Sequence, residues 1–443
     1  MSDAPWSDRR LHLIGVGGAG MSAYARAARE LGAEVTGSDR SDTPFARALV
    51  ADGVLAQLHL GHAPAHIPDG EDVEVVCSSA VPAENVERQA ALARGLRVLT
   101  RAELLAELTA LRRTIAVAGT HGKTTTASMI ARVLIEAGLD PGYLIGGVIR
   151  GTGAGGNWGS GEWLVVEADE SDRSLLSLHV EIAVLGNVEL DHHDQYGSLQ
   201  EIEAVFREFL AGAPVAVIWD RPELLALRDG PVRAFDAKPA LGRGGSRFAF
   251  DGVDVELAIP GVHNARNAAA ALTVAREVGV DLGTAAEALA HFTGAGRRFE
   301  RLGATASGAE VYDEYAHHPT ELAAGLAAAR TFAPERLIAA FQPHLFSRTR
   351  ALAREFGEAL AAADLVAVLD VYPARETAAD FPGVSGLLVA EAAADAAAGR
   401  PVYWLPDRAL AAQVLRELLQ PGDLLVVMGA GDIDELGRSL VDA

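Results

Sequence analysis

The segment at residues 118–125, AGTHGKTT, combines the residue types that bind a nucleotide phosphate. In such a loop the backbone N–H groups and the lysine, here Lys123, contact the phosphates, and the hydroxyl of Thr124 is a magnesium ligand. Val117 stands where the strict P-loop pattern has glycine, so the loop is a shortened variant of that pattern. The predicted ATP-binding residues of this segment are Gly119, Thr120, His121, Gly122, Lys123, Thr124 and Thr125.

Two acidic segments follow apolar runs further along the chain. Residues 167–172, EADESD, come directly after WLVV, and residues 187–194, NVELDHHD, come after IAVLG. Carboxylates at a strand end near a phosphate loop suit magnesium, because this ion takes oxygen ligands. The first segment predicts a second anchor for the metal, with a solvated acidic loop as the structural alternative. The second predicts a further cation site or groups beside the attacking nucleophile.

Another glycine-rich segment, GVGGAGMS, lies near the N-terminus between an apolar run and a helical pattern. Its glycines allow the backbone to approach a diphosphate at a helix N-terminus. Asp39 ends the next apolar run, where an acidic residue often contacts a ribose hydroxyl. His62, Ser78 and Ser79 are placed to close the same crevice, although helix capping is the commoner role of lone polar residues at strand ends. A nicotinamide dinucleotide site is the competing interpretation of this segment.

The C-terminal half holds three polar clusters. Asn264 and Asn267 open a helical pattern in GVHNARNAA, and their amides suit an adenine edge, although N-capping explains them as well. Arg297, in GRRFE, has the fork geometry that binds phosphate, with a salt bridge at a helix end as the alternative. The segments VYDEYAHHPTE and FQPHLFSRTR indicate a pocket for an anionic, amine-bearing substrate, formed by Asp313, Tyr315, His317, His318, His344 and Arg348.

Charge and composition exclude several classes of partner. The chain has 443 residues and a formal net charge of -22, which disfavours a polyanion such as DNA but permits a local nucleotide site. The single cysteine, Cys77, excludes an intrachain disulfide, and its apolar surroundings predict a buried thiol. No apolar run approaches ~18 residues, and the start MSDAPWSDRR lacks the apolar core of a signal peptide. We therefore expect a cytoplasmic protein with no nucleic-acid or membrane partner.

The polar and glycine-rich segments lie between apolar runs and Ala- and Leu-rich helical patterns, which must position them. The alternation of these runs and helical patterns predicts parallel βαβ units. Most of the runs end in Gly, Asp, Ser or His, at the strand ends where α/β proteins place ligands. A length of ~100–200 residues per domain gives about three domains. The predicted domains are residues 1–110, 111–299 and 300–443, and residues 240–261 predict a small β excursion inside the middle domain.

A series of motifs in order along nearly the whole chain resembles the Mur ligases: GVGGAGMS, AGTHGKTTT, EADESD, NVELDHHD, GVHNARNA, GRRFE, EYAHHPTE, FQPHLFSRT, DVYPARE and GAGDI. The resemblance implies an α/β protein with an N-terminal Rossmann-like domain for a UDP-sugar, a central P-loop-type ATPase domain and a C-terminal Rossmann-like domain for an amino acid. Within the family, the motifs are most similar to those of ligases that add L-alanine to UDP-N-acetylmuramate in peptidoglycan synthesis. Addition of a whole tripeptide to the same UDP-sugar is the alternative.

The resemblance also implies a mechanism and a set of site residues. The γ-phosphate of ATP is transferred to a carboxylate, and an amino group attacks the resulting acyl phosphate, with Mg²⁺ (or Mn²⁺) as the metal. The implied catalytic residues are Lys123, His121, Asn187 and His192, and the metal ligands are Thr124, Glu167 and His192. Asn264, Asn267, Arg297 and Asp313 would hold the nucleotide, and Tyr315, His317, His318, His344 and Arg348 the amino acid. The UDP-sugar residues would be Gly15, Gly17, Gly18, Ala19, Gly20, Met21, Ser22, Asp39, His62, Ser78 and Ser79.

Some residues depart from the family pattern. Leu190 and His193 stand where Pro and Met are frequent, and Leu345 stands where Arg often follows FQPH. Leu190 and His193 belong to the segment of the second predicted metal site, and Leu345 belongs to a segment of the predicted amino-acid pocket. Outside the family, GVGGAGMS also fits a dinucleotide-dependent oxidoreductase, but the second Gly-Lys-Thr loop is superfluous to such an enzyme. We expect small-molecule partners only, and a monomer or homodimer.

Overall fold

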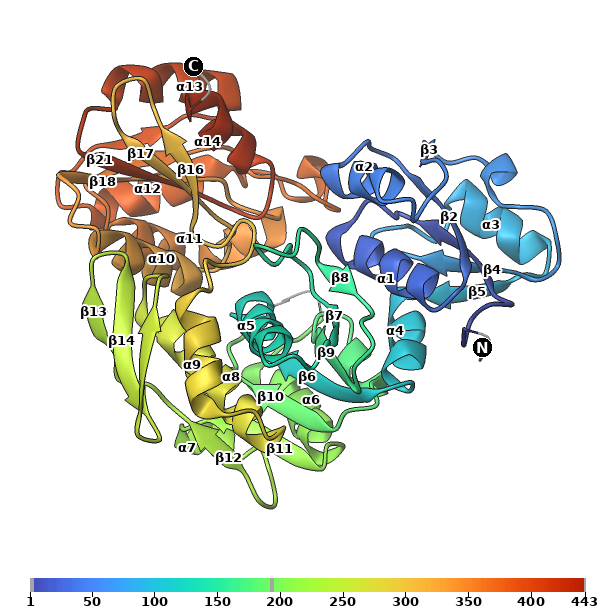
Figure 1. The fold of residues 1–443 in the computed structure, drawn as a ribbon. Helices are drawn as coiled ribbons and strands as arrows, with labels where there is room; N and C mark the ends of the chain where they lie inside the picture. The colour runs from blue at the N-terminus through green and yellow to red at the C-terminus, as the bar shows by residue number, and fades with distance from the viewer. Residues whose placement is uncertain (1–3, 192–194, 442–443) are drawn as a thin grey trace. The chain divides into compact units, whose positions relative to one another are not determined.

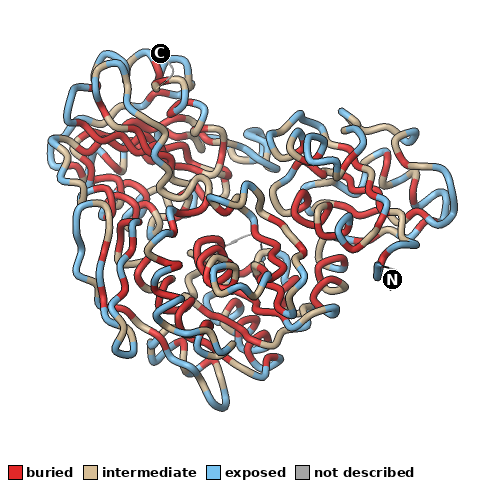
Figure 2. The backbone as a smooth tube through the Cα atoms, in the orientation of Figure 1, coloured by how far each residue is buried: buried red, intermediate tan, exposed pale blue. Residues whose placement is uncertain are grey.

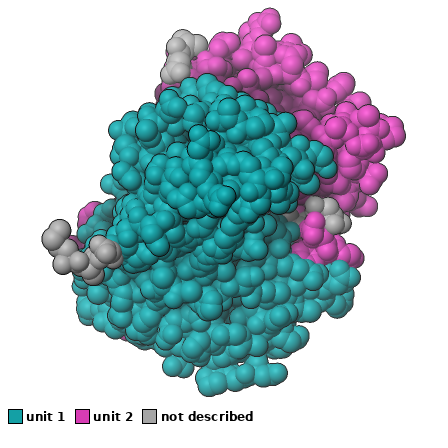
Figure 3. All heavy atoms as spheres, turned by 90° about the vertical axis from the view of Figure 1, so that its right-hand side faces the viewer, with its two compact units in different colours: residues 1–189, 198–235, 270–285 teal, residues 190–197, 236–269, 286–443 magenta. Residues whose placement is uncertain are grey.

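The computed structural model describes residues 4–191 and 195–441. Its internal contacts divide the chain into two compact units, which Figure 3 distinguishes by colour. Unit 1 consists of residues 1–189, 198–235 and 270–285, and unit 2 consists of residues 190–197, 236–269 and 286–443. The division into three domains with boundaries near residues 110 and 300 stays a prediction.

The first sheet of unit 1 has five parallel strands in the order β3-β2-β1-β4-β5. The strands are β1 (Arg10–Ile14), β2 (Glu34–Asp39), β3 (His59–Leu60), β4 (Val73–Cys77) and β5 (Arg97–Thr100). The helices are α1 (Ala19–Glu30), α2 (Pro44–Ala51), α3 (Val86–Ala93) and α4 (Arg101–Thr109), and Figure 1 shows α1, α2 and α3 around the strands. Central strands of such a sheet are covered on both faces, and four of the five residues in each of β1 and β4 are accordingly buried.

The second sheet of unit 1 has seven strands in the order β12-β11-β10-β6-β9-β7-β8, and only the β7–β8 pair is antiparallel. Its strands are β6 (Arg113–Ala118), β7 (Gly142–Leu144), β8 (Gly156–Asn157), β9 (Trp163–Glu167), β10 (Ile182–Leu185), β11 (Val215–Trp219) and β12 (Arg233–Phe235). The helices are α5 (Lys123–Glu136), α6 (Leu199–Ala211) and α7 (Pro222–Leu225). Because β9 and β10 flank β6 in register, the segments after these three strands meet at one edge of the sheet.

Unit 2 contains an antiparallel sheet of β13 (Ala240–Gly242), β14 (Gly245–Phe250) and β15 (Val253–Leu257). It also contains a six-stranded sheet in the order β16-β17-β21-β18-β19-β20, in which only β16 is antiparallel. These strands are β16 (Glu300–Ala304), β17 (Glu310–Glu314), β18 (Arg336–Phe341), β19 (Leu365–Val368), β20 (Val402–Trp404) and β21 (Asp423–Met428). The helices are α10 (Pro319–Arg330), α11 (Phe346–Leu360), α12 (Gly386–Ala396), α13 (Arg408–Leu418) and α14 (Ile433–Val441), while α8 (Val262–Glu277) and α9 (Leu282–Ala290) contain residues of both units.

The core of unit 2 lies on both faces of its six-stranded sheet. Leu337, Ala339 and Phe341 belong to one buried cluster, and Ile338 and Ala340 belong to the other, as expected when successive side chains of β18 point to opposite faces. Figure 2 shows the buried backbone concentrated in the central strands of the sheets.

The predicted α/β class with parallel sheets is confirmed. The β excursion forms β13–β15, and its residues belong to unit 2. Cys77 is buried, as predicted. Among the described residues, no helix has the length and apolar character that crossing a membrane requires.

Candidate active site

The turn between β6 and α5 holds the Gly-Lys-Thr segment. Val117 is buried in β6 and pairs with Glu167 of β9, so the strand continues to Ala118 and the turn is shorter than a standard P-loop. Gly119 has φ +132, and a Cβ there would lie 3.0 Å from the Asn187 carbonyl oxygen. Glycine is therefore required at this position by both the backbone angle and the close approach of the segment after β10.

Lys123 is held at the start of α5 by a buried carboxylate. Its Nζ donates to both carboxylate oxygens of Glu170 at 2.9 Å and to the Gly119 carbonyl at 2.6 Å. Burial acts to lower the pKa of Lys123, but the charges of Glu170 and Asp169 outweigh it and raise this pKa above its usual value. Lys123 is thus a cation whose counter-ion, Glu170, is fully buried. The sequence analysis did not assign this role to Glu170, although the residue lies within EADESD.

Thr124 and Glu167 come together as predicted for a magnesium site. The Thr124 hydroxyl donates to Glu167 Oε2 at 3.0 Å, and Glu167 Oε1 accepts from the Gly146 N–H at 2.6 Å. Glu167 is the last residue of β9, next to β6 in the sheet, so sheet register fixes this pair. A hydroxyl and a carboxylate side by side are hard oxygen donors that fit Mg²⁺. The third predicted ligand, His192, lies outside the described residues, as does His193.

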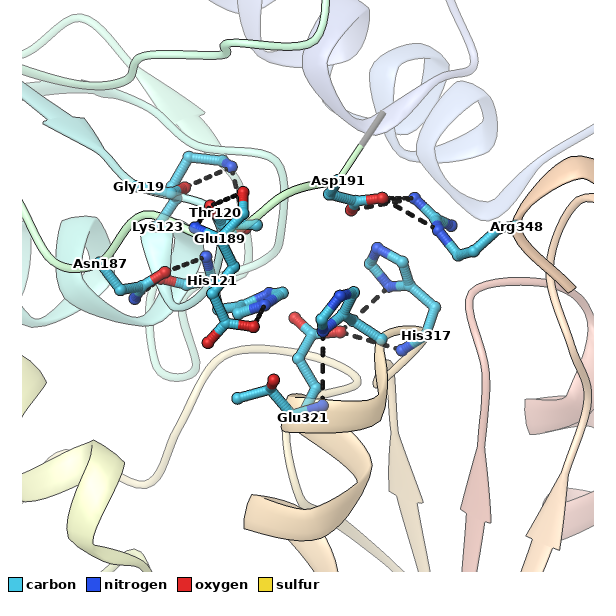
Figure 4. A network of polar contacts seen from close by, with 12 residues as sticks. Gly119, Thr120, His121, Lys123, Asn187, Glu189, Asp191, His317, Glu321 and Arg348 are labelled. Carbon is cyan, nitrogen blue, oxygen red and sulfur yellow. Dashed lines mark hydrogen bonds and ion pairs between the residues drawn. The ribbon is translucent and has the colours of Figure 1, made fainter. Parts of the chain in front are cut away.

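Asn187 binds the backbone of His121, as Figure 4 shows. The Asn187 Oδ1 accepts from the His121 N–H at 2.8 Å, and its Nδ2 donates to the His121 carbonyl at 2.9 Å. One residue earlier, the Thr120 hydroxyl donates to the Glu189 carbonyl at 3.2 Å and accepts from the Glu189 N–H at 2.8 Å. The His121 ring lies 3.4 Å from the Glu189 carboxylate. Asn187 therefore holds the conformation of the phosphate turn. Thr125, a further predicted ATP-binding residue, is buried in α5.

The N-terminal glycine-rich turn lies between β1 and α1. Gly15 has φ +81, and a Cβ there would meet the Ser78 Cβ at 2.9 Å. The Gly17 N–H donates to Asp39 Oδ2 at 2.8 Å, so Asp39 binds the turn itself. Gly18 is the N-cap of α1, and Ala19 and Gly20 begin the helix.

The remaining predicted UDP-sugar residues differ in exposure. Met21 and Ser22 are buried, with the Ser22 hydroxyl bonded to the Ala19 carbonyl, whereas Ser79 is exposed. His62 is partly buried, and its Nδ1 lies 3.2 Å from the Ser38 hydroxyl. Met21 and Ser22 thus pack within the protein, and the exposed surface of the turn consists mainly of backbone.

A buried carboxylate that the sequence analysis missed, Glu87, lies beneath His62. Glu87 accepts hydrogen bonds from the Ser38 hydroxyl at 2.5 Å and from the Ala63 N–H at 3.1 Å, and it contacts His66 at 2.8 Å. Burial acts to raise the pKa of Glu87, but hydrogen bonds from His12, Ser38 and Ala63 outweigh it and lower this pKa to about 2. Glu87 therefore stays ionised and fixes the ends of β2 and β3.

In unit 2, the predicted nucleotide residues form two separate groups. The Asn264 amide donates to the Pro260 carbonyl at 2.7 Å, and the Asn267 amide lies 3.4 Å from Asn264 Oδ1, at the start of α8. Arg297 donates from Nε to Asp313 Oδ2 at 3.0 Å and from its other nitrogens to the carbonyls of Gly429 and Gly431. Burial raises the pKa of Asp313 to about 6, despite the opposing effect of Arg297.

Of the predicted amino-acid residues of unit 2, His318 and Arg348 are buried and the others are partly buried. Arg348 binds Asp191 through a forked pair, in which Nε donates to Oδ1 at 3.1 Å and Nη2 donates to Oδ2 at 3.1 Å. Both side chains are buried, and sequence analysis did not identify Asp191 as this partner. Tyr315 lies 5.0 Å below the guanidinium groups of Arg297 and Arg298.

Two histidines of the same group, His317 and His344, have pKa values well below the usual range. Burial is the main cause that lowers the pKa of His317 to about 4 and that of His344 to about 3. The two rings lie 6.2 Å apart in an edge arrangement, and His344 also stacks on Tyr372. His318 caps α10, because its Nδ1 accepts from the Thr320 N–H. Neutral histidines accept hydrogen bonds, so His317 and His344 are suited to an ammonium donor.

Comparison with known proteins gives a consistent result over the whole chain. Three models of Mur ligase domains match: the Mur ligase family catalytic domain at residues 10–113, the Mur ligase middle domain at 117–275, and the Mur ligase glutamate ligase domain at 297–431. A UDP-N-acetylmuramate–L-alanine ligase of Kineococcus radiotolerans is 46% identical over 98% of this chain and 96% of its own length. The protein of that description from Rubrobacter xylanophilus is 44% identical over 98% and 99%.

Two crystal structures cover the same extent. That of the UDP-N-acetylmuramate-alanine ligase of Thermotoga maritima aligns over 98% of each chain with a TM-score of 0.83 and 26% identity. A murein peptide ligase of Psychrobacter arcticus aligns over 98% of each chain with a TM-score of 0.72 and 25% identity. Taken with the phosphate turn and its hydroxyl–carboxylate pair, these matches establish that the chain belongs to the Mur ligase family.

Proposed function

We propose that this chain is an ATP-dependent ligase that joins L-alanine to the lactyl carboxylate of UDP-N-acetylmuramate, a step of peptidoglycan precursor synthesis. The observation that carries the proposal is the phosphate turn, in which Lys123 is a cation and Thr124 lies 3.0 Å from Glu167. Relatives that are 44–46% identical over nearly the whole chain, and described as UDP-N-acetylmuramate–L-alanine ligases, support the choice of substrates. The proposed location is the cytoplasm.

The first chemical step is phosphoryl transfer from ATP. A carboxylate oxygen of the UDP-sugar attacks the γ-phosphorus, the bond to the bridging oxygen breaks, and ADP leaves. Lys123 moves from Glu170 to the phosphates and offsets the charge on the transferred group. A bound Mg²⁺ would be held by Thr124 and Glu167 and would neutralise charge on the phosphates. Asn187 keeps the turn in the shape that presents its N–H groups.

The second step is attack of the amine on the acyl phosphate. The ammonium group of L-alanine first loses one proton to water. Its nitrogen then bonds to the carbonyl carbon while the bond from that carbon to the phosphate oxygen breaks, and the nitrogen loses a second proton to the departing phosphate, which leaves an amide. His317 and His344 are neutral at pH 7 and accept hydrogen bonds from the incoming ammonium group. Asp191 holds Arg348 by a forked ion pair, which fixes the arginine beside His344.

Phosphate release tests the proposal directly. We expect release only when ATP, Mg²⁺, UDP-N-acetylmuramate and L-alanine are all present, and omission of any one should abolish it. Replacing L-alanine by the tripeptide separates this function from that of a murein peptide ligase. Turnover with the tripeptide and none with L-alanine would contradict the proposed amino-acid specificity. Phosphate release that does not depend on the UDP-sugar would contradict the function as a whole.

A further inference from the structure

One arginine of unit 1 stands where its own helix disfavours it. Arg101 is the first residue of α4, and a capping box of Thr100 and Glu103 fixes the start of the helix at this point. The N-terminus of a helix carries a partial positive charge, so a cation in the first turn is unfavourable unless carboxylates compensate it. Arg101 has two such partners, because its Nη2 donates to Asp169 Oδ2 at 3.1 Å and to Asp172 Oδ2 at 3.0 Å.

The segment that receives Arg101 is a compact turn after β9. Asp169 Oδ1 accepts from the Ser171 N–H at 2.9 Å, and Asp172 Oδ1 accepts from the Ser174 N–H at 3.0 Å. Each aspartate thus uses Oδ1 within the turn and Oδ2 for Arg101. The backbone of the turn therefore orients both carboxylates towards α4.

Asp169 lies between two cations. Its neighbour in the sequence, Glu170, accepts from Lys123 Nζ with both carboxylate oxygens at 2.9 Å. Lys123 and Arg101 are the cations that act most strongly on the Asp169 carboxylate. Because both cations are attracted to the same carboxylate, Arg101 reduces the attraction of Asp169 for Lys123.

The charges of the segment show why this reduction matters. Residues 167–172 contain four carboxylates, which face the two cations Lys123 and Arg101. The excess of two negative charges equals the charge of one Mg²⁺, and the predicted magnesium ligand Glu167 belongs to the same segment. Without Arg101 the excess would be three, and Lys123 would be held by Asp169 as well as by Glu170. An ammonium group held by more negative charge moves less readily to a phosphate.

We propose that Arg101 is a positioning residue for Lys123. It neutralises Asp169 and Asp172, so that the Lys123 ammonium group can leave Glu170 for the phosphates of ATP. This inference rests on the proposed function, because it takes ATP as the ligand of the second glycine-rich turn. Arg101 contacts no reacting atom in this role, and it acts through its charge.

The first test compares charge with hydrogen bonding at position 101. Arg101→Gln keeps an amide donor but loses the charge, whereas Arg101→Lys keeps the charge but loses the fork. Arg101→Gln should weaken ATP binding, measured by calorimetry without the other substrates, roughly 10-fold, and should lower kcat/KM for ATP roughly 10- to 100-fold. Arg101→Lys should stay within roughly threefold of wild type in both measurements. An equal loss in the two variants would overturn the proposal.

The matched control is Arg97→Gln. Arg97 is exposed on β5, just before α4, and it pairs with Glu74 and Glu107. This variant loses the same charge from the same part of the sheet, and it should bind ATP like wild type. A loss equal to that of Arg101→Gln would mean that any cation of this region has the same effect, and would overturn the specific role of Arg101.

A double variant separates charge balance from a structural clamp. Arg101→Gln combined with Asp172→Asn returns the negative excess to two, although the ion pair stays broken. Its kcat/KM for ATP should recover to within roughly fivefold of wild type. Asp172 is exposed, so its replacement has little effect on stability. If the double variant melts like wild type but is as impaired as Arg101→Gln, the pair is a clamp and the proposal is overturned.

Two further measurements exclude other roles of Arg101. The Mg²⁺ concentration for half-maximal activity should not rise in Arg101→Gln, because additional negative charge favours a cation. A rise of roughly 10-fold would mean that Glu167 is displaced, and would overturn the proposal. Binding of UDP should equal that of wild type, and a loss as large as the loss of ATP binding would contradict an action through Lys123.

The outcomes also separate this inference from the proposed function. If the wild-type protein binds no ATP and releases no phosphate, the proposed function fails together with the inference. If wild type binds ATP and turns over, and a folded Arg101→Gln variant does the same, only the inference fails.

Discussion

The two glycine-rich turns of unit 1 each join a strand to a helix, but their side-chain partners differ. The second turn contains its own cation, Lys123, and its own hydroxyl, Thr124, and the partners Glu167 and Glu170 come from the neighbouring strand end. The first turn, GVGGAGMS, contains no lysine or arginine, and its Gly17 N–H donates a hydrogen bond to Asp39.

A cation beside the first turn belongs to another element. Arg101 belongs to α4, and its Nη1 lies beside Gly20 only because β5 and β1 end at the same edge of the sheet. A motif that contains its own charged groups can be identified from local sequence. A motif completed by a distant residue needs the fold. The following experiments test this difference, from the largest expected effect to the smallest.

Lys123→Ala should lower kcat roughly 10³-fold, because it removes the cation that faces the transferred phosphate. The same change leaves Glu170 buried without its ion-pair partner, which destabilises the fold. A double variant, Lys123→Ala with Glu170→Gln, should recover thermal stability but not activity. Steady-state kinetics and thermal melting separate the two effects. Near-normal turnover of either variant would show that the second turn does not depend on its own lysine.

Glu87→Gln tests the support of the first turn through pH, because Glu87 binds Ser38, whose carbonyl accepts a hydrogen bond from the Gly15 N–H of this turn. The pKa of Glu87 is lowered to about 2 in the folded protein, from 4.5 in the unfolded chain. Its contribution to stability is therefore fully present above pH 4.5 and is lost as the pH falls towards 2. At pH 7 the variant should be less stable by up to about 3 kcal/mol, and this difference should shrink between pH 4.5 and 3. Urea denaturation at several pH values measures it, and a difference that stays constant with pH would contradict the role of Glu87.

Lys123 gives the opposite pH dependence in the second turn. Its pKa is raised in the folded protein, so its contribution is present below its unfolded value of 10.5 and is lost as the pH rises through the folded value. The first turn should therefore lose support in acid, and the second in alkali.

Glu167→Ala should raise the Mg²⁺ concentration for half-maximal activity roughly 10- to 100-fold, because the metal loses a charged ligand beside Thr124. Glu162→Ala is the matched control, since Glu162 is an exposed carboxylate just before β9 that pairs with Arg113. A magnesium titration of both variants is the measurement. If Glu167→Ala titrates like Glu162→Ala, Glu167 has a structural role only.

Gly17→Ala should destabilise the protein by about 1–2 kcal/mol, the smallest effect of this set. A Cβ at Gly17 would lie 2.7 Å from the Thr43 hydroxyl and 2.9 Å from Asp39 Oδ2. Gly18→Ala is the control, because its nearest neighbour would be 3.5 Å away and its φ is -74. Denaturation curves that show equal stability for the two variants would mean that the contact between the turn and Asp39 is easily displaced.

Much of the fold was predictable because α/β sheets leave strong local signals. Buried strands such as β9 and β10 are short apolar runs, and each was identified together with the acidic segment that follows it. The strands β3, β5 and β20 were not identified. They are short or partly exposed, so burial imposes no apolar run on their residues.

The candidate site was predictable to a similar degree. Thr124 and Glu167, both predicted as metal ligands, lie side by side, since a phosphate turn and the acidic end of the adjacent strand meet by sheet topology. Metal binding by the two residues stays a prediction. Asp191 as the partner of Arg348 was missed, because nothing local relates residues so distant in the chain. Met21 and Ser22 match the motif but are buried in α1, since the helical repeat turns them inward.

The sequence by itself determined the α/β class and the position of both glycine-rich turns, because periodicity and glycine act over a few neighbouring residues. The tertiary structure alone decided which charges became partners. Lys123 binds Glu170, Arg348 binds Asp191, and Arg101 binds Asp169 beside the first turn of α1. The physical reason is that a buried charge needs a counter-ion in space. Strand order, which brings β5 and β1 to one edge and β9 beside β6, decides where that counter-ion lies.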